Sequence, residues 1–231
     1  MNWLHLLRWT TIAAIVVVIV INILAGIIPP LVVFAVIWIG GFFWLRSSTR
    51  GPAILLLVAF IAFLALSAPF VIPTLTVPAS AGDFILNLGS LIAALVGIVA
   101  AIAVIRGRLE TAPAARSLAI GSVGLFVLAS VASVIATVSY EDAVAQEGDI
   151  SLVTQDIEFQ DESLDTEAGE VAVFVENKDN TLHTFTIDEL DVDLDIPAAK
   201  SARVSFTAPP GTYEFYCVPH KETMEGTLVV E

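Results

Sequence analysis

Long runs of apolar residues are the feature that most constrains what this chain can fold into. Five runs in the first 140 residues contain no Asp, Glu, Lys or His, and Arg stands only at or just beyond their ends; they cover residues 9–28, 31–45, 52–72, 84–105 and 117–139. A helix needs about 20 residues to cross about 30 Å of hydrocarbon, so four runs are long enough and the second run is marginal. Residues 1–140 are therefore predicted to form a membrane bundle of about five transmembrane helices.

The basic residues of this region predict how it lies in the membrane. All six lie either before the first run or in every second connection between runs. They are Arg8, Arg46, Arg50, Arg106, Arg108 and Arg116. The intervening connections, at residues 29–30 and 73–83, contain no Lys or Arg. Because cytoplasmic loops carry the excess of Lys and Arg, the amino terminus is predicted to be cytoplasmic and everything after Tyr140 extracytoplasmic. This orientation in the plasma membrane is the same whether the first two runs form two helices or a re-entrant hairpin.

Charge divides the chain near Tyr140. The first 140 residues hold six of the ten Lys and Arg and two of the 24 Asp and Glu, whereas residues 141–231 hold the other four basic and 22 acidic groups. This acidic part excludes a nucleic-acid reader, because phosphate binding needs basic surface. The apolar runs also lack the ionisable residues that proton relays, ion paths and haem sites need, so the bundle is predicted to be chemically silent.

After a linker at residues 141–149, the pattern changes to short segments in which apolar and polar residues alternate. Alternation is clearest at residues 170–176 and 190–196, and it predicts half-buried strands. Further candidate strands are residues 150–159, 183–187, 202–206, 212–217 and 227–230. Six or seven short strands in about 80 residues predict an all-β sandwich with Greek-key connections over residues 150–231.

Four metal-binding side chains gather in the predicted sandwich. Cys217, the single cysteine, is followed by His220 and Met224, and His183 lies upstream at the start of a predicted strand. A single cysteine excludes an intrachain disulfide, a four-thiolate iron–sulfur cluster and a zinc knuckle. Two imidazoles, one thiolate and one thioether are the donor set of a mononuclear type 1 copper site. Each residue alone has an ordinary explanation, as a buried cysteine, a core methionine or a loop-capping histidine, and their coincidence predicts the site.

Residues 150–231 resemble the plastocyanin/azurin (cupredoxin) family of blue copper domains in three motifs. These are Asn177–Phe185 (N-K-D-N-T-L-H-T-F), Pro210–Cys217 (P-G-T-Y-E-F-Y-C) and Cys217–Val229 (C-V-P-H-K-E-T-M-E-G-T-L-V). The resemblance covers about the last third of the chain. It implies one type 1 copper per chain, with His183, Cys217 and His220 as equatorial ligands and Met224 as the axial ligand.

Two positions depart from the family pattern, and a third has two interpretations. Thr184 follows the first ligand histidine, where plastocyanins and azurins often carry an asparagine that ties the two ligand loops together; the threonine hydroxyl is expected to serve that purpose less rigidly. Three residues separate His220 from Met224, a spacing that varies in the family and bears on the length of the axial bond. Tyr216 is either an electron exit, as the resemblance to plastocyanins implies, or an ordinary exposed strand tyrosine.

The predicted function is that of a membrane-anchored blue copper protein that carries single electrons between extracytoplasmic or membrane redox partners. The alternative is a copper-handling protein that stores or delivers the ion. An enzyme is not expected, since multicopper oxidases and copper nitrite reductases need more histidines than His5, His183 and His220, and the binuclear centre of oxidase subunit II needs two cysteines. The acidic segments at residues 156–170 and 188–195 either steer a partner with a basic docking surface or form a solvated face.

Overall fold

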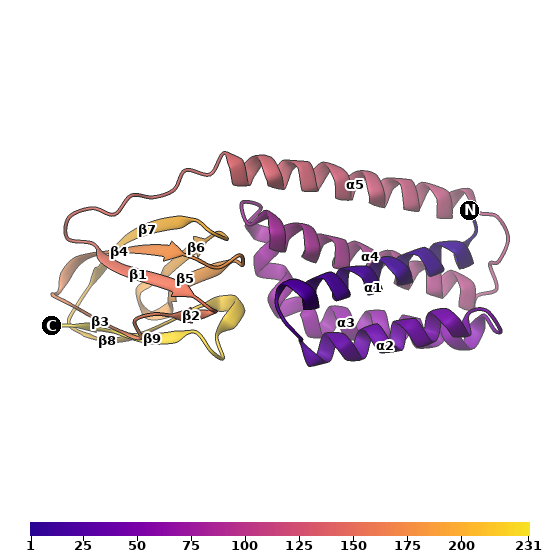
Figure 1. Cartoon of the computed structure of the whole chain (residues 1–231), viewed down its shortest axis with the longest axis horizontal. Coiled ribbons are helices and arrows are strands. Elements are labelled where there is room, and N and C mark those ends of the chain that lie inside the picture. The colour runs from indigo at the N-terminus through magenta and orange to yellow at the C-terminus, as the bar shows by residue number, and fades with distance from the viewer. The chain divides into compact units, whose positions relative to one another are not determined.

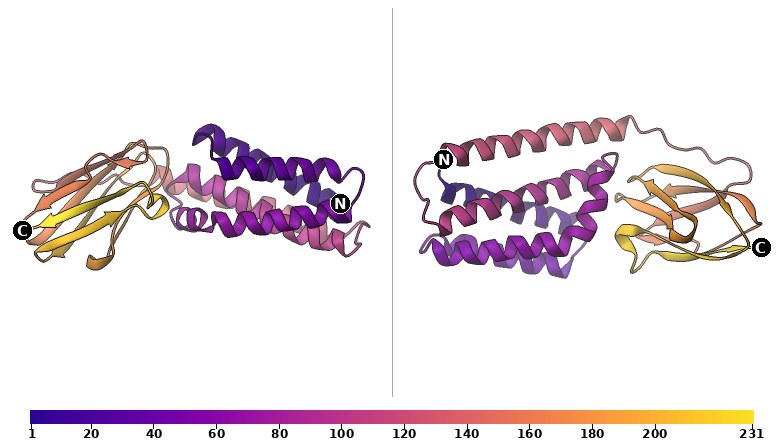
Figure 2. Two further views of the ribbon diagram at one scale, coloured as in Figure 1. Left: turned by 90° about the horizontal axis from the view of Figure 1, so that it is seen from below. Right: turned by 180° about the vertical axis from the view of Figure 1, so that it is seen from behind.

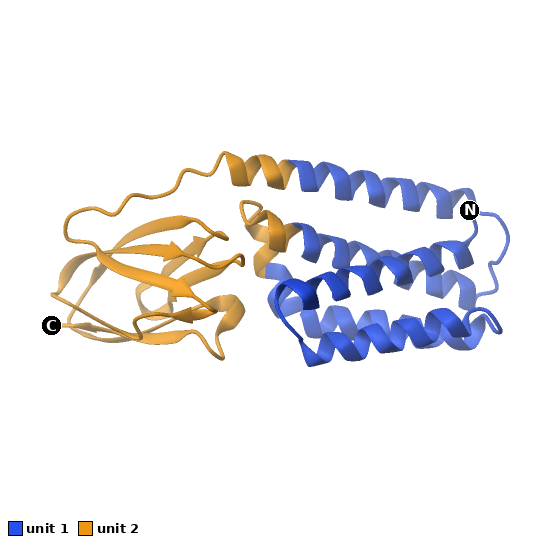
Figure 3. Ribbon diagram, viewed as in Figure 1, with its two compact units in different colours: residues 1–72, 85–131 blue, residues 73–84, 132–231 orange.

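The computed structural model describes residues 1–231, which form two compact units. The first unit contains residues 1–72 and 85–131, and the second contains residues 73–84 and 132–231 (Figure 3). The second unit therefore combines the β-rich end of the chain with a short connection between two helices.

Five helices come first along the chain (Figure 1). They are α1 (Trp3–Leu24), α2 (Pro29–Trp44), α3 (Arg50–Thr76), α4 (Ala81–Ile105) and α5 (Pro113–Val138). Four of them are long and apolar enough to cross a membrane, while α2, with 16 residues, is shorter. The predicted fold class, about five apolar helices followed by an all-β sandwich, is confirmed.

The helix boundaries differ by a few residues from the apolar runs that predicted them, and two of these differences come with local hydrogen bonds. Helix α1 begins at Trp3, well before residue 9, because the Asn2 side chain caps the helix by accepting a hydrogen bond from the His5 N–H at 2.8 Å. Helix α3 continues past Pro73 to Thr76, whose hydroxyl donates to the Pro73 carbonyl at 2.6 Å. Membrane helices tolerate such prolines where other groups satisfy the backbone, so the α3–α4 connection is shorter than predicted.

Aromatic rings fill the core of the first unit. The fully buried Trp38 ring has its centroid 5.1–5.7 Å from those of Phe34, Phe60 and Phe63. Gly97 of α4 makes room for this cluster, because a Cβ atom there would lie 2.5 Å from the Phe60 ring. A small residue thus lets two apolar helices approach closely.

Nine strands form the two sheets of a β-sandwich (Figures 1 and 2). One sheet has the order β2-β1-β4-β7 and the other has the order β3-β9-β8-β5-β6. Two neighbouring pairs, β1 with β4 and β3 with β9, are parallel. The strands are β1 (Ile150–Gln155), β2 (Glu158–Phe159), β3 (Ser163–Thr166), β4 (Gly169–Asn177), β5 (His183–Ile187), β6 (Val192–Ile196), β7 (Ser201–Ala208), β8 (Gly211–Tyr216) and β9 (Glu225–Val230).

The predicted alternation of the strands matches their burial in most places. Along β4 the three valines are buried between more exposed neighbours, whereas every residue of β5 is buried. Leu190 is an exception to the predicted strand at 190–196, because it ends the 3-10 turn Asp188–Leu190 before β6 begins. Phe215 of β8 lies at the centre of the core, with its ring 5.1 Å from that of Phe159 and 5.2 Å from that of Phe185.

Candidate metal centre

Two segments that are distant in sequence bring the candidate metal ligands together. His183 is the first residue of β5, Cys217 follows β8 directly, and His220 ends the short 3-10 turn Val218–His220. Backbone hydrogen bonds close this second segment: the Cys217 N–H donates to the Met224 carbonyl at 3.0 Å, and the Met224 N–H donates to the His220 carbonyl at 2.9 Å. A tight loop therefore supplies three of the four candidate ligands.

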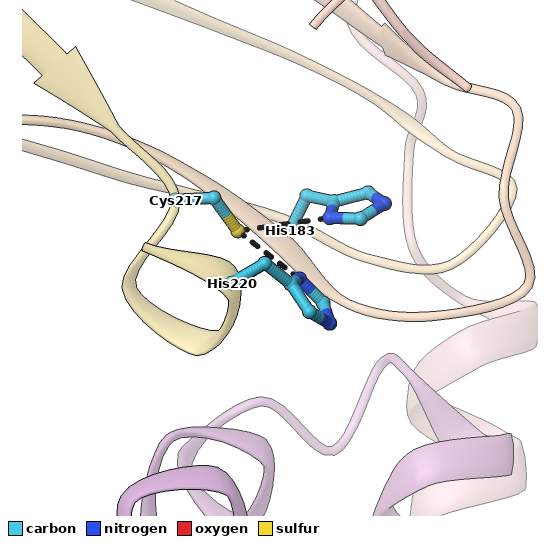
Figure 4. Close-up of side chains that lie close together, drawn as sticks. All are labelled: His183, Cys217 and His220. Carbon is cyan, nitrogen blue, oxygen red and sulfur yellow. Dashed lines mark hydrogen bonds between the residues drawn. The ribbon is translucent and has the colours of Figure 1, made fainter. Parts of the chain in front are cut away.

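The Cys217 sulfur lies between two imidazole rings (Figure 4). Its Sγ atom is 3.6 Å from Nδ1 of His183 and 3.4 Å from Nδ1 of His220, and one donor atom from each residue lies within 4.8 Å of the others. Bonds of about 2.0–2.3 Å from one metal ion to nitrogen and sulfur give ligand separations of this size. The three side chains therefore already point at a common centre.

Met224 occupies the same buried environment. Its side chain is fully buried in the sandwich core, as are those of Cys217 and His183. The hydrogen bonds of its backbone to Cys217 and His220 fix its position at the end of the loop. Its role as an axial ligand stays a prediction.

Burial sets the protonation of the sulfur and the rings. It raises the pKa of the Cys217 thiol to about 11, although hydrogen bonds from Thr184 act in the opposite direction. Burial, together with the neighbouring His183, also lowers the pKa of His220 to about 4. The imidazoles are therefore neutral at pH 7 and can donate a lone pair, whereas the thiol has to release a proton when it binds a metal.

Asp179 orients the ring of His183. A carboxylate oxygen of Asp179 lies 2.9 Å from Nε2 of His183 and accepts a hydrogen bond from the Nε2–H group. The unprotonated Nδ1 atom then faces the sulfur. Burial would raise the pKa of Asp179, but the hydrogen bonds from the Ile157 N–H, from His183 and from the Asp156 N–H lower it. Burial lowers the pKa of His183 as well, although the negative charges of Asp179 and Asp83 act to raise it.

Thr184 ties the two ligand segments together, as expected from its position. Its hydroxyl accepts a hydrogen bond from the Val218 N–H at 2.8 Å. Its own N–H donates to Sγ of Cys217 at 3.3 Å. Such an N–H donor stabilises the thiolate form of Cys217.

The sequence did not identify two residues near this centre. Asp179 stands four residues before His183 inside a quoted motif, and only the structure shows their hydrogen bond. Asp83 lies in the first turn of α4, and its carboxylate contacts the residues just before His183. No local pattern could have revealed the second contact, because it joins residues about a hundred positions apart.

Comparison with known proteins finds similarities in the later part of the chain. The sequence model of the family described as "Cupredoxin-like domain" matches residues 125–230. Similar solved structures include amicyanin from Paracoccus versutus (Thiobacillus versutus), with 15% identity over 38% of this chain and 85% of that one and a TM-score of 0.32. A reduced Cu(I) form of an amicyanin mutant at pH 4 has 22% identity over 38% of this chain and 86% of that one, with a TM-score of 0.33. No curated protein matches the chain.

Proposed function

Because the cupredoxin-like family model matches residues 125–230, we propose that this protein is a membrane-anchored type 1 copper protein that carries single electrons. The observation that carries the proposal is the position of the Cys217 sulfur, 3.4–3.6 Å from the Nδ1 atoms of two neutral imidazoles. A thiolate with two imidazoles and a nearby buried methionine is a donor set that suits copper. One copper per chain follows from one such cluster.

Each residue of the centre has a defined part in the proposal. His183, Cys217 and His220 are the equatorial ligands, and Met224 is the weak axial ligand. Copper bound there would supply a one-electron Cu(I)/Cu(II) couple. Asp179 holds His183 in the tautomer that presents Nδ1, and the Thr184 N–H holds the sulfur in place. A site held in this way by its surroundings changes little when its charge changes, which favours fast electron transfer.

Burial of the donors favours a carrier over a protein that delivers copper. His183, Cys217 and Met224 have no exposed surface, and only His220 is partly exposed. A metal held by buried ligands leaves slowly, while an electron can still pass through a partly exposed imidazole. His220 is therefore the proposed route to a partner.

The helices and the charge distribution support the remaining parts of the proposal. Four helices have the length and apolar composition of membrane spans, and the six basic residues of the region would place the amino terminus in the cytoplasm. The copper domain would then lie outside the plasma membrane. Its excess of acidic residues suits a redox partner with a basic docking surface.

Replacement of the sulfur tests the proposal directly. Copper-loaded wild-type protein is expected to show the intense blue absorption band of a copper–thiolate site, and Cys217→Ser is expected to lose it. His220→Gln should weaken or abolish the band, whereas His5→Gln, which changes the only histidine outside the domain, should keep it. A band that survives Cys217→Ser, or a purified protein that retains only zinc, would refute the proposal.

Met224→Leu separates the axial position from the equatorial ones. The variant is expected to keep the blue band and to have a higher reduction potential, because a weak electron donor is lost. Leucine has nearly the volume of methionine, so the core should remain packed. Loss of the colour would show that Met224 is more than a weak axial ligand.

A further inference from the structure

The connection between α3 and α4 belongs to the same compact unit as the β-sandwich (Figure 3). Asp83, in the first turn of α4, is one of only two acidic residues among the first 140. An acidic residue in the first turn suits the positive end of the helix dipole, but the hydrogen bonds of Asp83 also extend beyond its own helix. Its contacts suggest a specific use.

The Asp83 carboxylate binds the segment that leads into the metal centre. Its Oδ2 atom accepts a hydrogen bond from the Leu182 N–H at 2.6 Å and another from the Thr181 hydroxyl at 3.1 Å. Leu182 is fully buried and immediately precedes His183. A charge-assisted bond of this length is among the stronger hydrogen bonds in proteins, so it restrains the backbone beside the ligand.

Neighbouring contacts hold the connection itself in place. The Ser80 hydroxyl donates to the Asp83 carboxylate at 3.2 Å and accepts a hydrogen bond from the Ala198 N–H at 3.3 Å. On the other side, the hydroxyls of Ser133 and Thr137 near the end of α5 donate to the carbonyls of Pro78 and Ala79 at 2.6 and 2.8 Å. Asp83 is therefore presented to the ligand segment by a fixed piece of backbone.

We propose that Asp83 is a positioning residue for the copper ligand His183, and that its negative charge lowers the reduction potential of the site. This inference rests on the proposed copper function. The carboxylate restrains Thr181 and Leu182, and through them the start of β5, where His183 stands. A negative charge near the metal favours Cu(II) over Cu(I), because the oxidised ion carries one more positive charge.

This role gives the helix ends of the second unit a purpose beyond anchoring. One helix would be enough to hold a domain at a membrane. The contact with Leu182, by contrast, needs two consecutive helices with a short connection, and a further helix end that supplies Ser133 and Thr137. The helix ends that belong to the second unit would thus contribute to the properties of the copper site.

Variants of the full-length protein in detergent or lipid nanodiscs test the inference. Asp83→Asn removes the charge but keeps an oxygen acceptor, Asp83→Ala removes both, and Glu110→Gln removes the other acidic charge of the region as the matched control. Glu110 is exposed and has none of the hydrogen bonds that Asp83 makes. The measurements are the midpoint potential, the Cu(II) electron paramagnetic resonance spectrum, and hydrogen exchange of the Leu182 amide.

Asp83→Asn is expected to raise the midpoint potential and to change the hyperfine splitting of the Cu(II) spectrum, while Glu110→Gln leaves both unchanged. Loss of a hydrogen bond to a charged group should speed exchange at the Leu182 amide by about tenfold or more in Asp83→Ala. Asp83→Glu, which restores the charge on a longer side chain, should return the potential toward the wild-type value. A role limited to folding would not give this ordered response of the potential.

The possible failures can be told apart. If copper binds with its blue band but Asp83→Asn and Asp83→Ala leave the potential, the spectrum and the exchange unchanged, the inference is wrong and the proposed function stands. If no blue band forms in the wild type, the proposed function is wrong, and so is the proposed effect of Asp83 on the reduction potential. Exchange of the Leu182 amide in metal-free protein still tests the contact, and an unchanged rate in Asp83→Ala would refute it.

Discussion

The helical region and the β-sandwich use apolar side chains in opposite ways. Along α5, Leu128 is 73% exposed and Val138 is 80% exposed, and many large apolar residues of the other helices are also exposed. In the sandwich the core side chains are fully buried, and Val144, Ile157 and Val218 are the only large apolar residues with substantial exposure after Tyr140. The first pattern suits a hydrocarbon solvent and the second suits water. The meaning of an apolar residue therefore depends on which solvent its region faces.

The two regions also carry separate spectroscopic reporters. All four tryptophans lie within the first 44 residues, and all three tyrosines lie from residue 140 onward. Tryptophan fluorescence therefore follows the helical region, while near-ultraviolet tyrosine signals and the blue band follow the sandwich. Changes in one region can be measured in the same sample as the response of the other.

The largest expected effect comes from placing a charge on an exposed apolar position of each region. Leu128→Arg in α5 should cost about 2.5–3.5 kcal/mol of membrane insertion, because an arginine near the middle of a spanning helix is poorly tolerated. Val144→Arg changes a residue that is 77% exposed but lies in the linker, so it should cost almost nothing. The measurement is the fraction of chains in which α5 spans the membrane, read from the accessibility of the linker after α5 to protease added on one side. Equal behaviour of the two variants would contradict a lipid-facing α5.

A smaller effect is expected from adding one methyl group at the tightest glycine of each region. At Gly226 the new Cβ would overlap the Phe215 ring and lie 2.8 Å from the backbone oxygen of Glu162, and at Gly97 it would lie 2.5 Å from the Phe60 ring. Each alanine should destabilise its region by about 1–3 kcal/mol. Gly226→Ala is expected to be the more destabilising of the two, because the backbone oxygen of Glu162 cannot rotate away as a side chain can. Thermal unfolding followed by tyrosine signals should report the first change, and tryptophan fluorescence the second. A larger loss at Gly97 would reverse the ranking.

The smallest expected effect concerns the ion pairs, which lie in the acidic half of the chain. Arg203 holds Asp149 through two hydrogen bonds of 2.8 Å, and this contact, together with the Gln146 N–H, lowers the pKa of the Asp149 carboxyl. A lowered pKa contributes stability that is present above the ordinary carboxyl pKa of about 4 and is lost as the pH falls through the lowered value. Wild-type sandwich should therefore lose more thermal stability below about pH 4 than Asp149→Asn does. Glu147→Gln is the matched control, and parallel pH profiles for wild type and Asp149→Asn would exclude this contribution.

Sequence alone predicted the elements that depend on local pattern. Hydropathy located the five helices, because a run of apolar residues needs no distant partner to be recognised. The alternation of Val171, Val173 and Val175 similarly predicted β4. The strand β3 was missed, since its four residues contain Leu164 as the only apolar side chain and pair with β9 at the far end of the domain.

The candidate site divides in the same way. The spacing of Cys217, His220 and Met224 is local and was visible, and the role expected of Thr184 as a tie between loops is confirmed by its bond to the Val218 N–H. The contact of Asp83 with Leu182 was invisible, because both the end of α3 and the fold of the sandwich decide which residues meet. Position in space, and not residue type, supplied that information.

The complete burial of Cys217 has a consequence for how the folded molecule meets reactive chemicals. The chain has one sulfhydryl, which is enclosed by the core, and burial raises its pKa so that it stays protonated. Thiol-directed alkylating agents and oxidants act on accessible thiolates, so they find no accessible thiol on the intact protein. Two copies therefore cannot be crosslinked through sulfur while they stay folded, and labelling with iodoacetamide would count only the molecules whose sandwich has opened.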